Sequence, residues 1–260
     1  MKIIISPAKK MNCRTDFMPC SGTPVLLART QELLERVRQL TYNEAKAVWK
    51  CNDKIAELNY RRFQEMDLAQ GMTPGMTPAL LAYEGIQYQY MSPQVFEARE
   101  WEYVQEHLRI LSGFYGILKP LDKVTPYRLE MQARLKIGDK KQLYDFWGSQ
   151  IYDELAKEES CVINLASKEY SLCIENYLSP EIRYITCIFG EDSNGKILQK
   201  GTQAKMARGE MVRFLAETGA GEPEKMKEFR RLGYTYREDL SSGEKYVFLK
   251  GDRKKNVEDW

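Results

Sequence analysis

The sequence predicts a mixed α/β fold in which a central mixed sheet is surrounded by helices. Two short runs, residues 2–6 and 161–165, have the β-branched and apolar character of internal strands. Amphipathic stretches such as residues 25–40 repeat leucine and valine at helical spacing. Because no low-complexity linker divides the chain, we expect one domain over residues 1–260.

Three helices are expected in the first quarter of the chain. Residues 25–40 should form the first, which Pro24 precedes. Thr41 should cap the second, because Glu44 stands three residues later in the capping-box position. Residues 53–63 continue with apolar side chains at helical spacing.

Two longer helices are expected further along. Ser92 and Pro93 suit the N-cap and first position of a helix that reaches Leu111. Residues 143–155 are predicted to be helical as well. The duplicated tetrapeptide at residues 71–78 (GMTPGMTP) is predicted to be a loop, and we assign it no function.

The second half of the chain mixes strands with one long helix. After the strand at 161–165 we expect a hairpin, then a helix, then a closing pair of strands. The ranges are 182–189 with 197–198 for the hairpin, 202–218 for the helix, and 234–236 with 246–249 for the closing pair.

Composition excludes several classes of protein. The chain has 43% hydrophobic and 29% charged residues and no apolar run long enough to span a bilayer, so we expect a cytoplasmic protein that does not enter membranes. We also expect it to be a monomer. The six cysteines form no CxxC pair, and His107 is the only histidine. We therefore expect neither a disulfide framework nor a metal site, and no cofactor.

Positive charge is uneven although the net charge is only +2. Lys9 and Lys10 belong to an N-terminal segment without acidic residues, and two further basic segments lie at 119–136 and 200–213. Each could be a solvated face. Together in one groove they would be typical of a nucleic-acid-binding surface.

Residues 108–118 are the candidate for a helix-hairpin-helix-like turn. An apolar helix is expected to run into Ser112, Gly113 and, after two aromatic residues, Gly116. Glycines permit a tight turn whose backbone N–H groups could hold a DNA phosphate. The alternative is an ordinary turn between two helices.

Lys205, Arg208 and Gly209 lie on the predicted helix at 202–218. With Thr202 as N-cap, Lys205 would stand in the first turn, where a cation opposes the helix dipole. We hypothesise an anion site there, with Gly209 allowing a ligand to approach closely. The alternative is a pair of surface cations engaged in ion pairs.

Polar residues follow two of the predicted strands. Ser6 and Lys9 come after the first, and Asn164 and Ser167 lie at and just beyond the end of the strand at 161–165. If the two strands are parallel neighbours, these residues share the carboxyl edge of the sheet, which is the usual ligand crevice of open α/β folds. Ser167 could instead only cap the following helix.

Three other features have simpler interpretations. Arg128 and Glu130 are expected to form an ion pair that holds their loop. Tyr127 is one of several aromatics that could stack bases but are more typical of a core, and His107 is expected to be structural.

Several stretches together resemble the YaaA family of peroxide-stress proteins, in the family's order and over nearly the whole chain. They are residues 5–9 (ISPAK), 53–56 (DKIA), 58–59 (LN), 62–63 (RF), 107–116 (HLRILSGFYG), 119–122 (KPLD), 126–131 (PYRLEM), 143–144 (LY), 146–148 (FWG), 162–167 (VINLAS), 169–170 (EY), 204–205 (AK) and 207–209 (ARG). The resemblance implies a cytoplasmic protein that limits oxidative damage, is associated with lower free iron, and binds DNA through a helix-hairpin-helix element beside a positive cleft.

Two functions are therefore expected, and no catalytic residue can be named for either. The first is sequence-independent binding of double-stranded DNA by Lys9, Lys10, Ser112, Gly113, Gly116, Lys119, Arg128, Lys205, Arg208 and Gly209. The second is an enzyme acting on a nucleotide-like or phosphorylated small molecule, in a crevice lined by Ser6, Lys9, Asn164, Ser167 and Lys205. Direct iron storage is not expected, because the chain lacks clustered histidine and carboxylate ligands.

Overall fold

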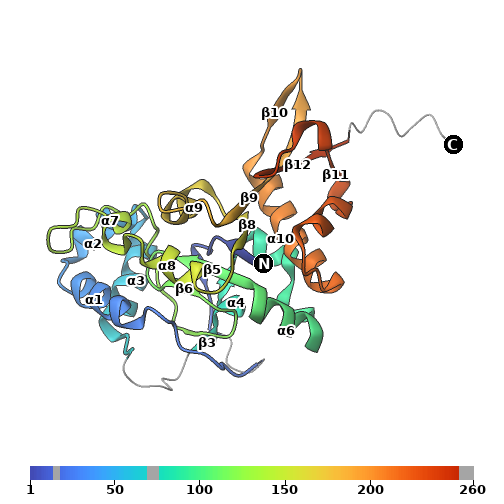
Figure 1. Ribbon diagram of the computed structural model, residues 1–260. Helices are drawn as coiled ribbons and strands as arrows, with labels where there is room; N and C mark the ends of the chain where they lie inside the picture. Colours follow the sequence, from blue (N-terminus) through green and yellow to red (C-terminus); the bar gives the residue numbers. More distant parts are fainter. Residues whose placement is uncertain (14–17, 69–75, 252–260) are drawn as a thin grey trace.

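The computed structural model describes residues 1–13, 18–68 and 76–251, and its centre is a mixed sheet (Figure 1). The strands of this sheet are β1 (Lys2–Ile5), β5 (Leu108–Ser112), β6 (Gly116–Leu118), β8 (Cys161–Leu165), β9 (Arg183–Ser193), β10 (Lys196–Leu198), β11 (Tyr234–Tyr236) and β12 (Lys245–Lys250). Their order is β11-β12-β9-β8-β1-β5-β6, and β10 pairs with β9. The mixed α/β prediction is confirmed.

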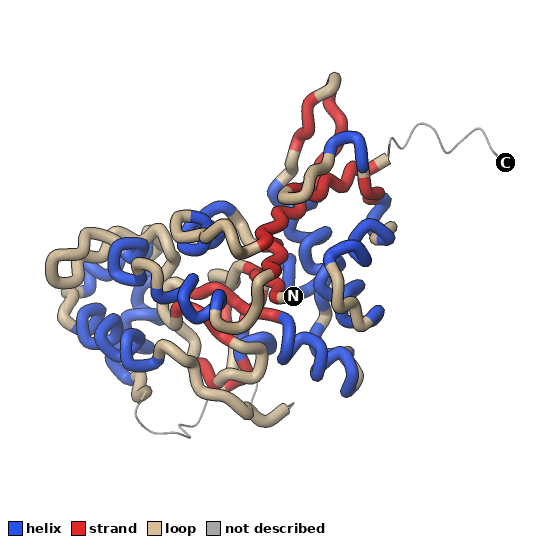
Figure 2. Tube along the Cα trace, in the orientation of Figure 1, coloured by secondary structure: helices blue, strands red, loops and turns tan. Residues whose placement is uncertain are grey.

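Helices surround the sheet, as Figure 2 shows. They are α1 (Leu27–Arg38), α2 (Tyr42–Trp49), α3 (Asp53–Glu65), α4 (Ala79–Ala82), α5 (Ile86–Met91), α6 (Ala98–His107), α7 (Leu143–Trp147), α8 (Gln150–Ala156), α9 (Lys168–Glu175) and α10 (Gly201–Thr218), with 3-10 turns η1 (Pro93–Val95), η2 (Pro223–Glu228), η3 (Arg231–Gly233) and η4 (Glu238–Leu240). Two small ribbons pair β2 (Lys10–Met11) with β4 (Tyr83–Glu84) and β3 (Thr77–Pro78) with β7 (Lys123–Val124). Within the described ranges, no helix has both the length and the apolar character needed to cross a membrane.

Strand β1 lies at the middle of the fold. Ile3, Ile4 and Ile5 are completely buried, and β1 pairs in parallel with β5 on one side and β8 on the other. Strands covered on both faces read as continuous apolar runs, which is why this strand was predictable.

The connections of the sheet reverse direction between β1 and β8. From β1 the chain next joins the sheet at β5 on one side, whereas from β8 it next joins at β9 on the other side. Ligands of open α/β sheets bind beyond the carboxyl ends of the strands at such a switch point. Ser6 follows β1 and Ser167 follows β8 at this place.

Most predicted elements are confirmed with shifted ends. The Thr41–Glu44 capping box is present, and α1 and α3 occupy the first and third predicted helices. The predicted strand at 161–165, the β9–β10 hairpin and the antiparallel pair β11–β12 are also present.

The single helix predicted from Pro93 to Leu111 is wrong. Ser92 has a left-handed backbone (φ 51°) and its side chain makes no capping hydrogen bond. Pro93 begins only the short η1, and α6 ends at His107, where the chain turns into β5. The apolar run at 108–112 is a strand because it pairs with β1, and a short apolar run does not reveal this by periodicity.

The helix predicted over residues 143–155 is divided in two. Gly148 takes a positive φ of 51° between α7 and α8, which ends the first helix. Most of the duplicated tetrapeptide, and the C-terminal residues 252–260, lie outside the described residues.

Helix α10 packs closely against α5 at Gly209. A Cβ placed on Gly209 would lie 2.2 Å from the backbone oxygen of Gln87 and 3.0 Å from the amide nitrogen of Met91. The prediction that Gly209 admits a ligand is therefore wrong, because α5 occupies that space.

Gly209→Ala should destabilise the protein by roughly 1–3 kcal/mol, because the added methyl group would overlap the α5 backbone. The measurement is the free energy of unfolding in urea. Gly201→Ala on the same helix is the matched control, because a Cβ there meets nothing within 4 Å. Equal stability of the two variants would contradict the packing argument.

Candidate functional site

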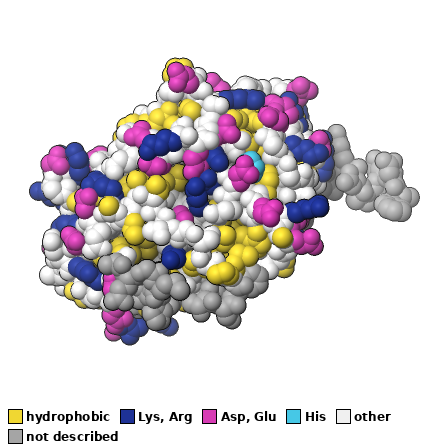
Figure 3. All heavy atoms as spheres, turned by 60° about the horizontal axis from the view of Figure 1, so that its bottom comes forward, with side chains coloured by type: hydrophobic (Ala, Val, Ile, Leu, Met, Phe, Trp, Pro, Cys, Tyr) yellow, Lys and Arg dark blue, Asp and Glu magenta, His cyan; other side chains and the backbone are white. Residues whose placement is uncertain are grey.

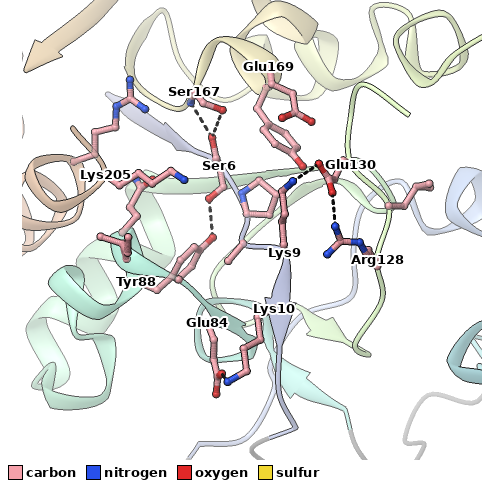
Figure 4. A pocket seen from close by; sticks show the side chains of 18 of the residues that line it. Ser6, Lys9, Lys10, Glu84, Tyr88, Arg128, Glu130, Ser167, Glu169 and Lys205 are labelled. Carbon is pink, nitrogen blue, oxygen red and sulfur yellow. Dashed lines mark hydrogen bonds and ion pairs between the residues drawn. The ribbon is translucent and has the colours of Figure 1, made fainter. Parts of the chain in front are cut away.

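A pocket of about 370 Å³ lies beyond the carboxyl ends of β1 and β8 (Figure 4). Its walls come from the loops after these strands, the segment from β4 into α5, residues 127–130, and α10. Segments far apart in the sequence therefore meet at the topological switch point.

Ser6 and Ser167 join the two strand ends directly. The backbone N–H of Ser167 donates to Ser6 Oγ at 2.8 Å, and Ser6 Oγ lies 3.1 Å from Ser167 Oγ. The Tyr88 hydroxyl donates to the backbone oxygen of Ser6 at 2.9 Å. Ser167 is the N-cap residue of α9, but its side chain makes no capping hydrogen bond, so the alternative that Ser167 only caps this helix is wrong.

One wall of the pocket carries a compact ion cluster. Lys9 Nζ lies 2.8 Å and Arg128 Nη2 lies 3.0 Å from the carboxylate of Glu130. The predicted Arg128–Glu130 pair is confirmed. Lys10 forms an ion pair with Glu84 beside this cluster. Carboxylates therefore accompany all three cations on this side of the pocket.

Glu169 is the second carboxylate near Glu130 but has no cation of its own. It is half-buried, accepts a long hydrogen bond of 3.4 Å from the backbone N–H of Gln132, and forms no salt bridge within the described part of the chain. Burial raises its pKa, and the nearby charge of Glu130 adds to this.

The opposite wall, α10, carries Lys205 and Arg208 (Figure 4 labels Lys205). Neither forms an ion pair with any residue that the structure describes. Nε of Arg208 is buried without a hydrogen-bond partner there, and burial lowers the pKa of its guanidinium. Because α10 begins at Gly201, Lys205 stands beyond the first turn, which corrects the predicted position.

The helix-hairpin-helix prediction is wrong. Ser112, Gly113 and Gly116 belong to the β5–β6 hairpin, in which Ser112 pairs with Gly116, and all three are buried. Ser112 Oγ accepts the N–H groups of Phe114 and Tyr115 at 3.2 and 2.9 Å. These amides are used inside the fold, so they cannot hold a phosphate.

Lys119 also lies away from the pocket. Its Nζ is 3.5 Å from the carboxylate of Glu158. The same carboxylate accepts a hydrogen bond from Arg109 Nε at 2.8 Å and lies 3.6 Å from Lys2 Nζ. Lys2 opens β1 and Arg109 lies near the start of β5, so this cluster marks the amino edge of the sheet. Placing Lys119 with the other candidate cations is therefore wrong.

Of the five residues predicted for a small-molecule crevice, Ser6, Lys9, Ser167 and Lys205 line the same pocket. Asn164 does not. Its Oδ1 accepts the N–H of Ala166 at 2.9 Å, and it faces a neighbouring hollow.

Sequence reasoning missed Glu169 and Tyr88 as site residues. Glu169 lies four residues beyond the end of β8, so its position near the carboxyl edge of the sheet could have been inferred from the predicted strand. Tyr88 gave no signal, because its contact with Ser6 joins residues 82 positions apart.

His107 has the structural role that was predicted. Its Nδ1 lies 2.8 Å from the backbone oxygen of Met1, and its ring packs against Tyr103 at a centroid distance of 4.3 Å.

Comparison with known proteins adds a family assignment. A family model described as "Peroxide stress protein YaaA" matches residues 1–240. A UPF0246 protein of Agathobacter rectalis is 56% identical over 248 residues, covering 95% of this chain and 98% of that protein. UPF0246 proteins of Lachnoclostridium phytofermentans and Pediococcus pentosaceus are 52% and 51% identical, with coverage of 97% or more of this chain and 99% of each protein.

The raised pKa of Glu169 predicts a pH dependence of stability. Above the ordinary glutamate pKa, and up to the raised one, the folded protein keeps a proton that the unfolded chain releases. The free energy of unfolding should therefore fall as the pH rises through this interval, and Glu169→Gln should remove that part of the fall.

Urea denaturation of both proteins across a pH series measures this difference. Glu102→Gln, which changes an exposed glutamate on α6, is the matched control. If the stability of wild type relative to Glu169→Gln rose with pH, the assignment would have the wrong sign.

Proposed function

This chain belongs to the peroxide stress protein YaaA family, and we propose that it acts in the cytoplasm by binding a phosphorylated, nucleotide-like small molecule in the switch-point pocket. The anionic group of this ligand contacts Lys205 and Arg208. The observation that carries the proposal is the unpaired, partly buried guanidinium of Arg208.

A buried cation without a partner is costly, and an anion that pairs with it recovers much of this cost. The residues that line the pocket include five basic and three acidic side chains, so its walls carry an excess of two positive charges. The carboxylates lie with Lys9, Lys10 and Arg128. The excess positive charge therefore belongs to Lys205 and Arg208 on α10, and a phosphate group bound beside them would compensate it.

The size of the pocket supports a small ligand. Its volume of about 370 Å³ is in the range of small-molecule sites, roughly 300–1,000 Å³. Ser6 and Ser167 bond each other, and neither histidine nor cysteine occurs among the described residues that line the pocket. The proposal is therefore for binding, and names no chemical reaction.

Replacing Lys205 and Arg208 together by glutamine should weaken binding of adenosine 5′-monophosphate at least about tenfold, because hydrogen bonds to charged groups contribute about 1.5–3 kcal/mol each. Isothermal titration calorimetry measures the affinity, and a thermal-shift series with inorganic phosphate measures the anion subsite alone. Unchanged affinity in the variant would refute the site.

Arg213→Gln is the matched control on the same helix, because Arg213 pairs with Glu217 at 2.7 Å outside the pocket. It should leave the affinity unchanged. Without ligand, Arg208→Gln should be at least as stable as the wild type, because it removes an unpaired buried cation. This separates loss of binding from loss of folding.

Double-stranded DNA is a second candidate, supported by the convergence of Lys9, Lys10, Arg128, Lys205 and Arg208 at one pocket. The ion pairs of Lys9, Lys10 and Arg128 with carboxylates weaken the attraction of this pocket for DNA. The face that Figure 3 shows carries interspersed basic and acidic side chains, so that face presents no continuous basic surface. Binding would be electrostatic and independent of sequence.

With two unpaired cations, the slope of log affinity against log salt concentration for duplex DNA should be about −1.8. Gel-shift titrations at rising salt measure this slope, and the Lys205, Arg208 double variant should flatten it. A slope near zero in the wild type would exclude contact with the DNA backbone.

A further inference from the structure

A second hollow adjoins the switch-point pocket, and Arg208 lines both. The second hollow is larger and more open, about 1040 Å³, and lies beyond the carboxyl end of β8 between α9 and β9. An anion bound to Arg208 would therefore stand between two spaces.

Among the described residues that line the second hollow, every cation except Arg208 is paired with a carboxylate. Lys168 forms an ion pair with Glu175, and Arg183 lies 2.9 Å from Glu224. Its remaining polar lining consists of neutral hydrogen-bonding side chains and two exposed carboxylates, Glu181 and Glu244, which disfavour a second anionic group. The neutral side chains include Asn164, Ser171, Ser179, Thr186 and Gln199. This lining suits an uncharged polar group such as a nucleoside.

The second hollow adds no positive charge of its own to the site. Its carboxylates Glu175, Glu181 and Glu244 outnumber Lys168 and Arg183, and Arg183 is paired with Glu224. A phosphodiester carries one negative charge and a group on each side, whereas a terminal phosphate monoester carries up to two charges and a group on one side only.

We propose that the anion at Arg208 is an internal phosphodiester, and that the two groups it links occupy the two hollows. This inference rests on the proposed function of the first pocket and names its substrate class. The link is the same in a free dinucleoside monophosphate and in a single strand of nucleic acid, so the test must distinguish these sources.

The experiment compares three sets of probes by calorimetry with the full chain. They are the four 5′-mononucleotides, the four matching dinucleoside monophosphates, and single-stranded octanucleotides of each base. We expect a dinucleoside monophosphate or an octanucleotide to bind at least about tenfold more tightly than its mononucleotide. Preference for the dinucleoside identifies a free ligand, and preference for the octanucleotide identifies a strand.

Gly243→Trp tests the second hollow. Gly243 lines it, and a Cβ at this position meets nothing within 4 Å, so a bulky side chain can be added to this wall without a clash at the backbone. The variant should remove the advantage of the longer probe and leave mononucleotide affinity unchanged. Gly221→Trp is the control, because Gly221 is equally unobstructed.

Each outcome has one meaning. If mononucleotides bind as tightly as the longer probes, or if Gly243→Trp leaves their ratio unchanged, the phosphodiester inference is wrong and the proposed function stands. If no probe of any set binds, the proposed function itself is wrong.

Discussion

The burial of β1 between two parallel neighbours determines the position of everything that we assign to function. The chain joins the sheet after β1 at β5, on one side, and after β8 at β9, on the other side, so it leaves β1 and β8 in opposite directions, and the two departing loops border a crevice. The hydrogen bond from the Ser167 amide to Ser6 Oγ closes the base of that crevice. Lys205 and Arg208 of α10 line the same crevice as Ser6 and Ser167.

Charge is distributed differently at the two edges of the sheet. At the amino edge, Lys2, Arg109 and Lys119 share one carboxylate, Glu158, so each of these cations has an anionic neighbour. At the carboxyl edge, Lys205 and Arg208 form no ion pair with any residue that the structure describes. A basic segment in the sequence does not reveal which edge it will occupy, because the partner carboxylate is distant in the chain.

The sequence predicted the α/β class, the buried strands, the capping box at Thr41 and four of the five residues suggested for the crevice. These follow from apolar runs and from strand ends, which are local signals. The sequence did not predict that residues 108–112 form a strand, because their strand conformation depends on pairing with β1, which is distant in the chain. The phosphate-binding hairpin failed for the same reason: Ser112 and its glycines serve the sheet. Tyr88 reaches the pocket through a tertiary contact alone, whereas Glu169 follows a predicted strand end closely enough to have been included.

The close contact at Gly209 has a mechanical consequence. Helix α5 carries Tyr88, which holds the backbone of Ser6, while α10 carries the cations of the opposite wall. Because Gly209 has no side chain, the α10 backbone packs directly against Gln87 and Met91 of α5, so a shift of one helix would displace the other. A guest entering this cavity therefore meets walls that are already set in place, and selectivity would come from rigid fit and not from closure around the guest.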